Sequence, residues 1–342
     1  MKILASPYRA FSEVNPTQAL LYDSIEKHGA QVSEFSMRKL FWESWDVWHL
    51  HWPVESILVR RKGSRFLRLF EFWIGLKVAR LKKIRIFWTA HNLRPHERDQ
   101  LLLERMIWRA LLANIDGIIC MSDVSKRELL KEHPECSSIL VHTIPHGHYR
   151  GAYPDEMSRD EARAALGVSA DEFVGVFIGQ IRPYKGVVQL VRCFVEAQVT
   201  NSKLFVAGVA NDSLRRELES AAVPGSNIRL HFGFVDRNDI QKYLRAADLV
   251  ILPYIEILNS GSAILALSFD RPILVPARGA LSELRYVVGP DWVSLYEDQL
   301  NPEIVRAAIQ WTKAREAQPD TPAPLDALSW DRIGRLTIQA FS

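Results

Sequence analysis

Short apolar segments alternate with longer segments of helical periodicity along the whole chain. Short apolar runs are typical of strands buried in a sheet, and apolar residues three and four positions apart are typical of helices packed on one. Strands are predicted at residues 2–6, 47–52, 84–89, 115–120, 140–144, 173–178, 203–208, 228–232 and 249–253. Helices are predicted at residues 17–28, 98–113, 160–166, 187–199, 237–247, 263–268 and 329–341. The alternation predicts an α/β fold with mostly parallel sheets.

The same pattern begins afresh after a polar, turn-rich stretch at residues 150–158. A chain of 342 residues exceeds the size that a single hydrophobic core usually serves. We therefore predict two α/β domains, residues 1–150 and 151–324. The stretch 318–324 contains prolines and is expected to lead the terminal segment, from about residue 325 to residue 342, back to the first domain.

The composition is that of an ordinary globular protein, with 48% apolar and 24% charged residues. The three cysteines, Cys120, Cys136 and Cys193, show no CxxC spacing, so neither a disulfide framework nor a zinc site is predicted. No uncharged apolar run reaches the ~18 residues of a membrane span, and the first residues lack the long apolar region of a signal peptide. We expect a cytoplasmic protein.

Basic residues are concentrated in the segment 57–88, from Ile57 to Trp88, although the net charge of the chain is only +3. Ten basic residues and one acid, Glu71, are interleaved there with aromatic and aliphatic residues. Such a pattern favours an amphipathic helix lying on an anionic membrane surface. A packed helix with a solvated basic face is the alternative. No base-stacking or groove-reading module is found, so no nucleic-acid partner is expected.

A glycine turn with two cations follows the predicted strand 173–178. Gly179 opens this turn, Arg182 and Lys185 lie within it, and the helix 187–199 comes next. Backbone N–H groups at a helix N-terminus together with fixed positive charges suit a diphosphate. The alternative is an ordinary strand–helix loop with solvated basic residues.

A second small polar turn follows the predicted strand 249–253. It contains Asn259, Ser260, Gly261 and Ser262 and opens the apolar helix 263–268. Its backbone N–H groups are a second place to hold phosphate oxygens. Two such anion-binding turns in one domain are less easily explained as chance than one.

Polar residues also follow two strands of the first domain. His91 and Glu97 come after the strand 84–89, and Glu13 lies in the loop after the first strand. Ligands bind at the carboxyl ends of parallel strands, so both loops are candidate site walls. The alternative for residues 90–97 is a polar turn that caps the next helix. His49 and His51, in the strand 47–52, are expected to be buried and hydrogen-bonded, with no metal.

The order and spacing of these motifs resemble the GT-B nucleotide-sugar glycosyltransferases, in which two Rossmann-like domains face a cleft and a C-terminal helix crosses back. More narrowly, they are similar to the xanthan-type β-1,4-mannosyltransferases of glycosyltransferase family 94. The matching motifs are Leu50-His51-Trp52-Pro53, Thr89-Ala90-His91-Asn92-Leu93-Arg94-Pro95-His96-Glu97, His146-Gly147-His148-Tyr149-Arg150, Ile181-Arg182-Pro183-Tyr184-Lys185-Gly186, Asn259-Ser260-Gly261 and Val288-Gly289-Pro290.

This resemblance implies transfer of mannose from GDP-mannose, with inversion, to a polyprenyl-diphosphate-linked oligosaccharide in bacterial exopolysaccharide synthesis. The protein would then be peripheral, on the inner face of the plasma membrane. The resemblance implies that Arg182 and Lys185 hold the donor diphosphate and that residues 260–262 give it backbone N–H groups. It also implies that His91 lies near the transferred sugar.

The chain departs from the broader group in two respects. Retaining members carry a pair of glutamates around the second turn, and this chain has Leu265 where the second would open the helix. No Asp-x-Asp triplet occurs, so neither a metal nor another cofactor is expected. Glu13, Glu97 and, third, His91 are the candidates for the general base. A UDP-sugar donor, or a catalytically silent sugar-nucleotide-binding subunit, remains an alternative.

Overall fold

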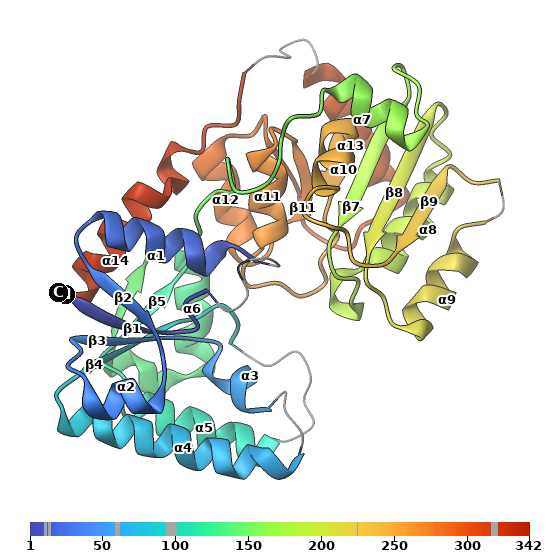
Figure 1. Ribbon diagram of the computed structural model, residues 1–342. Helices are drawn as coiled ribbons and strands as arrows, with labels where there is room; N and C mark the ends of the chain where they lie inside the picture. The colour runs from blue at the N-terminus through green and yellow to red at the C-terminus, as the bar shows by residue number, and fades with distance from the viewer. Residues whose placement is uncertain (10–11, 13–14, 59–61, 94–100, 224, 316–320) are drawn as a thin grey trace. The chain divides into compact units, whose positions relative to one another are not determined.

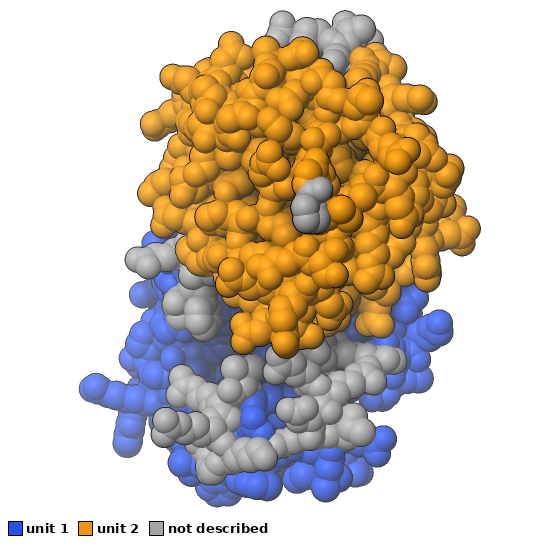
Figure 2. Space-filling view, turned by 90° about the vertical axis from the view of Figure 1, so that its right-hand side faces the viewer, with its two compact units in different colours: residues 1–147, 328–342 blue, residues 148–327 orange. Residues whose placement is uncertain are grey.

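The computed structural model describes residues 1–9, 12, 15–58, 62–93, 101–223, 225–315 and 321–342. The chain forms two compact units (Figure 2). Unit 1 comprises Met1–Gly147 and Leu328–Ser342, and unit 2 comprises His148–Ala327. The sequence placed the first boundary three residues later, after residue 150, and the return to the first domain near residue 325.

Unit 1 is built on a six-stranded sheet in the order β2-β1-β3-β4-β5-β6. Every neighbouring pair of its strands is parallel. The strands are β1 (Lys2–Ser6), β2 (Gln31–Glu34), β3 (Val47–His51), β4 (Arg85–Thr89), β5 (Gly117–Cys120) and β6 (Leu140–Thr143). The order reverses direction at β1, so the carboxyl ends of β1 and β3 mark the place where such sheets bind ligands.

Helices cover both faces of this sheet, with α1 and α14 on one face and α4 and α5 on the other (Figure 1). The helices are α1 (Thr17–Lys27), α2 (Met37–Trp42), α3 (Pro53–Leu58), α4 (Lys62–Leu81), α5 (Leu101–Leu112), α6 (Asp123–Glu132), the short 3-10 helix η1 (Pro134–Ser138) and α14 (Trp330–Phe341). Side chains of β3 alternate between the two faces. His49 lies against Phe341 of α14, whereas Trp48 lies against Phe72 of α4.

Unit 2 contains a second parallel sheet of six strands, in the order β12-β11-β10-β7-β8-β9. Its strands are β7 (Phe173–Ile178), β8 (Ser202–Gly208), β9 (Ile228–Phe232), β10 (Leu249–Ile251), β11 (Ile273–Pro276) and β12 (Val293–Tyr296). Its helices are α7 (Arg159–Leu166), η2 (Pro183–Lys185), α8 (Val187–Ala197), α9 (Asp212–Ala221), α10 (Ile240–Ala246), α11 (Gly261–Ser268), α12 (Ala280–Val288), α13 (Pro302–Arg315) and η3 (Asp326–Leu328).

The fold departs from the predicted elements in a few places. The segment 57–88 is not one helix, because α4 ends at Leu81 and residues 85–88 belong to β4. The pattern also missed the strands β2, β11 and β12 and the helices α2, α3, α9, α12 and α13. Among the described residues, no helix combines the length and the apolar character needed to cross a membrane.

Candidate active site

The first turn of the predicted diphosphate site follows β7 and leads through η2 into α8. Gly179 opens it with a backbone φ of +132°, a conformation that other residues rarely adopt. A Cβ atom at this position would lie 3.4 Å from Ser262 Oγ and 3.7 Å from Lys185 Nζ. The structure therefore brings the ammonium group of the first turn and the hydroxyl group of the second turn against the same glycine.

Backbone contacts hold the two turns together. The N–H of Ile255, after β10, donates to the carbonyl oxygen of Tyr184 at 2.8 Å. Gly186 has a φ of +65°, and a Cβ atom there would lie only 2.2 Å from the carbonyl oxygen of Pro253. A side chain at residue 186 would force the two loops apart.

The second turn ends at the N-terminus of α11. Ser260 caps this helix, because its Oγ accepts the N–H of Ala263 at 3.1 Å. Ser260 Oγ donates to the hydroxyl group of Tyr254 at 3.3 Å, and Ser262 is also hydrogen-bonded to that group. Asn259 is half-buried in the loop before the cap. Sequence reasoning missed Tyr254, although an aromatic residue directly after a buried strand could have drawn attention to it.

Two positive charges lie in the first turn. Lys185 is largely buried, and this burial, together with the nearby Arg182 guanidinium, lowers the pKa of the lysine to about 8. Its Nζ lies 5.7 Å from the ring centre of Tyr254. Arg182 Nη1 donates to the carbonyl oxygen of Ile181 at 3.3 Å. A bound anion would stabilise the charged lysine, so the pair is suited to a diphosphate.

His91 lies in unit 1, just beyond the end of β4. Its ring stacks on the indole of Trp52, with the ring centres 4.2 Å apart and the planes at 26°. His91 Nε2 and His51 Nδ1 are 2.8 Å apart and share one hydrogen. The resemblance places His91 near the transferred sugar. His91 follows β4 and is held by residues at the end of β3, the neighbouring strand.

The contact between His91 and His51 is the end of a buried chain of hydrogen bonds. The hydroxyl group of Tyr22 lies 2.8 Å from His51 Nε2 and 2.8 Å from His49 Nδ1, and His49 Nε2 lies 2.7 Å from Thr89 Oγ1. Burial lowers the pKa of His49 to about 3 and places the pKa values of His51 and His91 well below the usual range. The three rings are therefore neutral at pH 7, and each has one donor and one acceptor nitrogen. As a result, the tautomer of one ring constrains the tautomers of the others.

The other two base candidates, Glu13 and Glu97, lie outside the described residues. Within the part of the chain that the structure describes, no group of three or more histidine, cysteine or acidic residues could hold a metal ion.

Comparison with known proteins agrees with this geometry. The family described as "Glycosyl transferases group 1" matches residues 158–266, which include the two turns. A "GDP-mannose:glycolipid 4-beta-D-mannosyltransferase" of Xanthomonas campestris pv. campestris is 30% identical over 99% of this chain and 91% of its own. The chain is a group 1 glycosyltransferase.

Solved structures agree on the fold of this glycosyltransferase. Sucrose-phosphate synthase from Thermosynechococcus elongatus aligns over 99% of this chain and 94% of its own, with 16% identity and a TM-score of 0.61. WaaG, a glycosyltransferase involved in lipopolysaccharide biosynthesis, aligns over 98% of this chain and all of its own, with 15% identity and a TM-score of 0.64. The predictions of a GT-B fold and of a hexosyltransferase are confirmed.

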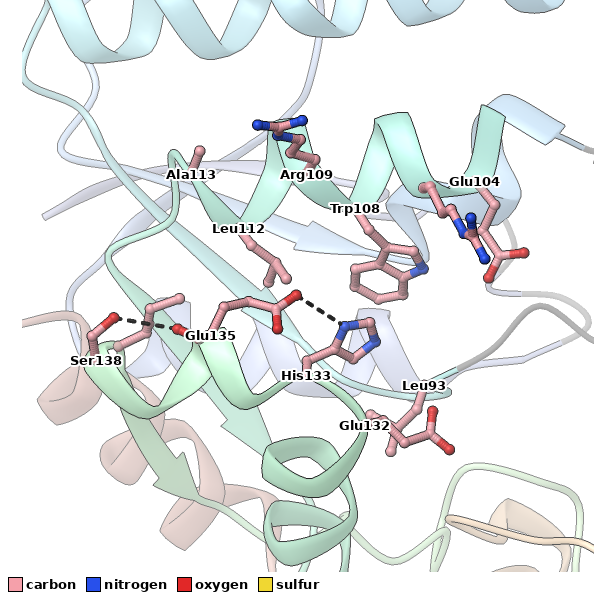
Figure 3. Close-up of a pocket in the computed structure, with 12 residues that line it drawn as sticks. Leu93, Glu104, Trp108, Arg109, Leu112, Ala113, Glu132, His133, Glu135 and Ser138 are labelled. Atoms are coloured by element: carbon pink, nitrogen blue, oxygen red, sulfur yellow. Dashed lines mark hydrogen bonds and ion pairs between the residues drawn. The ribbon is translucent and has the colours of Figure 1, made fainter. Parts of the chain in front are cut away.

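Two cavities of unit 1 in this glycosyltransferase were not foreseen from its sequence. One, of about 870 Å³, lies between α5, α6 and η1 (Figure 3). Trp108 and His133 face each other in it with ring centres 4.8 Å apart, and Glu135 pairs with His133 at 3.5 Å. Of the predicted site residues that the structure describes, none lines this cavity.

The other cavity, of about 720 Å³, lies at the carboxyl ends of β1 and β3. Ser6, His51, Trp52 and Glu55 are among its lining residues. Glu55 was not singled out in the sequence, because it sits in the short helix α3, where a carboxylate usually faces solvent.

Proposed function

We propose that the protein transfers mannose from GDP-mannose to a polyprenyl-diphosphate-linked oligosaccharide, with inversion at the anomeric carbon. The observation that carries this proposal is the convergence of Lys185 and Ser262 on Gly179, in a chain that shares its family with a mannosyltransferase. Exopolysaccharide synthesis on the inner face of the membrane is part of the same proposal.

The two turns of unit 2 supply the groups that a leaving nucleoside diphosphate needs. When the bond between the anomeric carbon and the diphosphate oxygen breaks, negative charge grows on the phosphates. Lys185 and Arg182 stabilise that charge, and the N–H groups at the start of α11 donate hydrogen bonds to the same oxygens. No metal is required for this step in the proposal.

The acceptor hydroxyl group attacks the anomeric carbon from the side opposite the diphosphate, which inverts the configuration. Its proton passes to a general base, for which Glu13, Glu97 and His91 are candidates. Burial keeps the His91 ring neutral at pH 7 with one acceptor nitrogen, but its lowered pKa makes it a weak base.

The membrane part of the proposal rests on α4. Phe66, Leu67, Phe70 and Trp73 are exposed on this helix, with Phe66 72% exposed. Several of the basic residues that the structure describes in this segment have protein partners. Arg80 pairs with Asp116, Lys82 donates to carbonyl oxygens at the end of α2, and Arg85 donates to the carbonyl oxygen of Ser342. The exposed apolar residues of α4 are therefore stronger support for membrane contact than the number of basic residues in the segment 57–88.

Thermal unfolding with GDP or UDP tests the nucleotide. A ligand that binds only the folded protein raises its melting temperature, and we expect GDP to do so more than UDP. Arg182→Ala and Lys185→Ala each remove a charge-assisted contact worth about 1.5–3 kcal/mol, so GDP affinity should fall about ten- to a hundredfold.

Lys313→Ala, which removes an exposed lysine of α13, is the matched control and should leave GDP affinity unchanged. A larger shift with UDP would contradict the proposed donor. Unchanged GDP affinity in both turn variants would contradict the proposed diphosphate site.

A further inference from the structure

The cavity of about 720 Å³ in unit 1 has the size and position of a ligand site. Pockets for small molecules span roughly 300–1,000 Å³ and occur where the strand order of an open α/β sheet reverses. Ser6 and Pro7 line it at the end of β1, and His51 and Trp52 line it at the end of β3. All of its lining residues belong to unit 1.

The lining combines aromatic rings with carboxylates. Phe35, Trp48, Trp52 and Phe72 supply the rings, and Glu34, Glu55 and Glu71 supply the carboxylates. Sugars present apolar C–H faces that pack on aromatic rings and hydroxyl groups that donate to carboxylates. Arg68 also lines the cavity, but the three carboxylates outnumber it, so the combination fits a sugar better than a phosphate, which carboxylates repel.

The backbone at Trp52 is strained. Its φ of +47° is uncommon for any residue with a side chain and a genuine outlier for a bulky one. Such strain is found mainly at ligand-binding and active sites. Here it accompanies an indole that lines the cavity and also stacks on His91. The strained residue thus joins the cavity to a candidate active-site residue.

Glu55 is the carboxylate of this cavity best suited to take a proton. Burial raises its pKa, although its side chain is also hydrogen-bonded to Asn92, which follows β4 directly after His91. A carboxylate becomes a better base as its pKa approaches the working pH. The bond to Asn92 fixes the carboxylate beside the ends of β3 and β4.

We propose that this cavity holds the terminal sugar of the acceptor and that Glu55 is the general base. This inference rests on the proposed function. The acceptor O–H bond breaks and its proton passes to the Glu55 carboxylate, while the oxygen forms a bond to the anomeric carbon of the donor. The bond to the diphosphate breaks, and its electron pair leaves with GDP.

The opposite face of α4 accounts for the lipid part of such an acceptor. Arg68 and Phe72 of α4 line the cavity, whereas Phe66 and Phe70 of the same helix are exposed. One helix therefore serves a sugar on one side and an apolar surface on the other, as a lipid-linked sugar requires.

The test uses GDP-mannose with short-chain prenyl-diphosphate-linked disaccharides that end in glucose, mannose or glucuronate. Glu55→Gln keeps the shape of the side chain but removes the base, so kcat should fall about 10²–10⁴-fold, while GDP affinity and acceptor KM stay near the wild-type values. Trp52→Ala should raise the acceptor KM. Glu135→Gln, which changes a carboxylate of the other cavity, is the matched control.

The kcat values of Glu13→Gln and Glu97→Gln are measured alongside that of Glu55→Gln. Wild-type kcat in Glu55→Gln, with loss of turnover in either of the other two, would overturn the assignment of the base. Binding of the disaccharide probes without donor, followed by saturation-transfer NMR, separates this inference from the proposed function. One outcome is that the probes bind to the wild-type protein, that Trp52→Ala abolishes this binding, and that no mannose is transferred. In that case the cavity assignment holds and the proposed reaction is contradicted. If the wild-type protein does not bind any probe, the cavity assignment is wrong.

Discussion

Lys185 gives the donor site a charge that titrates near neutral pH. Burial, and secondly the charge of Arg182, lower the pKa of its ammonium group to about 8 in the free protein. A bound diphosphate stabilises the charged form and therefore raises that pKa. The lysine must then take up a proton when GDP binds above pH 8.

GDP affinity should therefore be constant below about pH 8 and fall as the pH rises from 8 toward the pKa of the bound state. GDP affinity falls with rising pH because the charged lysine binds the anion and the neutral lysine does not. Calorimetry at pH 7 to 9 in buffers of different ionisation heat measures both the affinity and the proton uptake.

Lys185→Arg is the matched control, because a guanidinium group stays charged over this range. Titration of GDP itself affects both proteins equally, so only the difference between them reports on residue 185. Equal pH dependence in the two proteins would contradict the role given to Lys185.

Sequence alone could foresee some of these residues and not others. Gly179, Lys185 and Ser262 were expected to share a ligand, because each lies in a polar turn at the end of a buried strand. Trp52 and Glu55 could not be foreseen, since their significance depends on a positive φ and on contacts with the neighbouring strand exit. Glu13 and Glu97 lie outside the described residues and stay predictions.

At the scale of elements, the long central strands were predictable because both their faces are buried. The three missed strands are four residues each, and β2 and β12 lie at sheet edges, where mixed burial leaves no continuous apolar run. The helix α4 was foreseen from its interleaved basic and aromatic residues. Its inner face was not, because Gly75 lies against Trp48, a contact between distant parts of the chain.

The exposed aromatic face of α4 predicts how the protein meets membranes. Replacing Phe66, Phe70 and Trp73 by serine removes three side chains whose burial contributes about 1.5–3 kcal/mol each. Partition onto phosphatidylcholine–phosphatidylglycerol vesicles should fall at least ~100-fold. Co-sedimentation with vesicles measures it.

Phe234→Ser, which removes an aromatic side chain of unit 2 that is 62% exposed, is the control and should bind vesicles normally. Added salt should weaken binding of the wild-type protein only in part, because apolar contact is not screened. If the triple variant binds vesicles as strongly as the wild-type protein does, the proposal that α4 contacts the membrane is contradicted.

At the scale of the molecule, alternating strands and helices repeated in two halves suffice to predict two α/β domains, whereas the GT-B fold and the glycosyltransferase activity were expected only from the resemblance of the motifs to a known family. Donor sugar and acceptor depend on side chains that meet only in the folded chain. Glu55 and Trp52 become neighbours of His91 and Asn92 only when β3 and β4 pair.

The configuration of the product tests the central claim most directly. The purified protein is incubated with GDP-mannose and a prenyl-diphosphate-linked oligosaccharide, and the one-bond coupling between the anomeric carbon and its hydrogen is measured by NMR. Inversion of the α-linked donor predicts a β-mannoside. An α-mannoside, or sugar transfer from a UDP-sugar with none from GDP-mannose, would contradict the account.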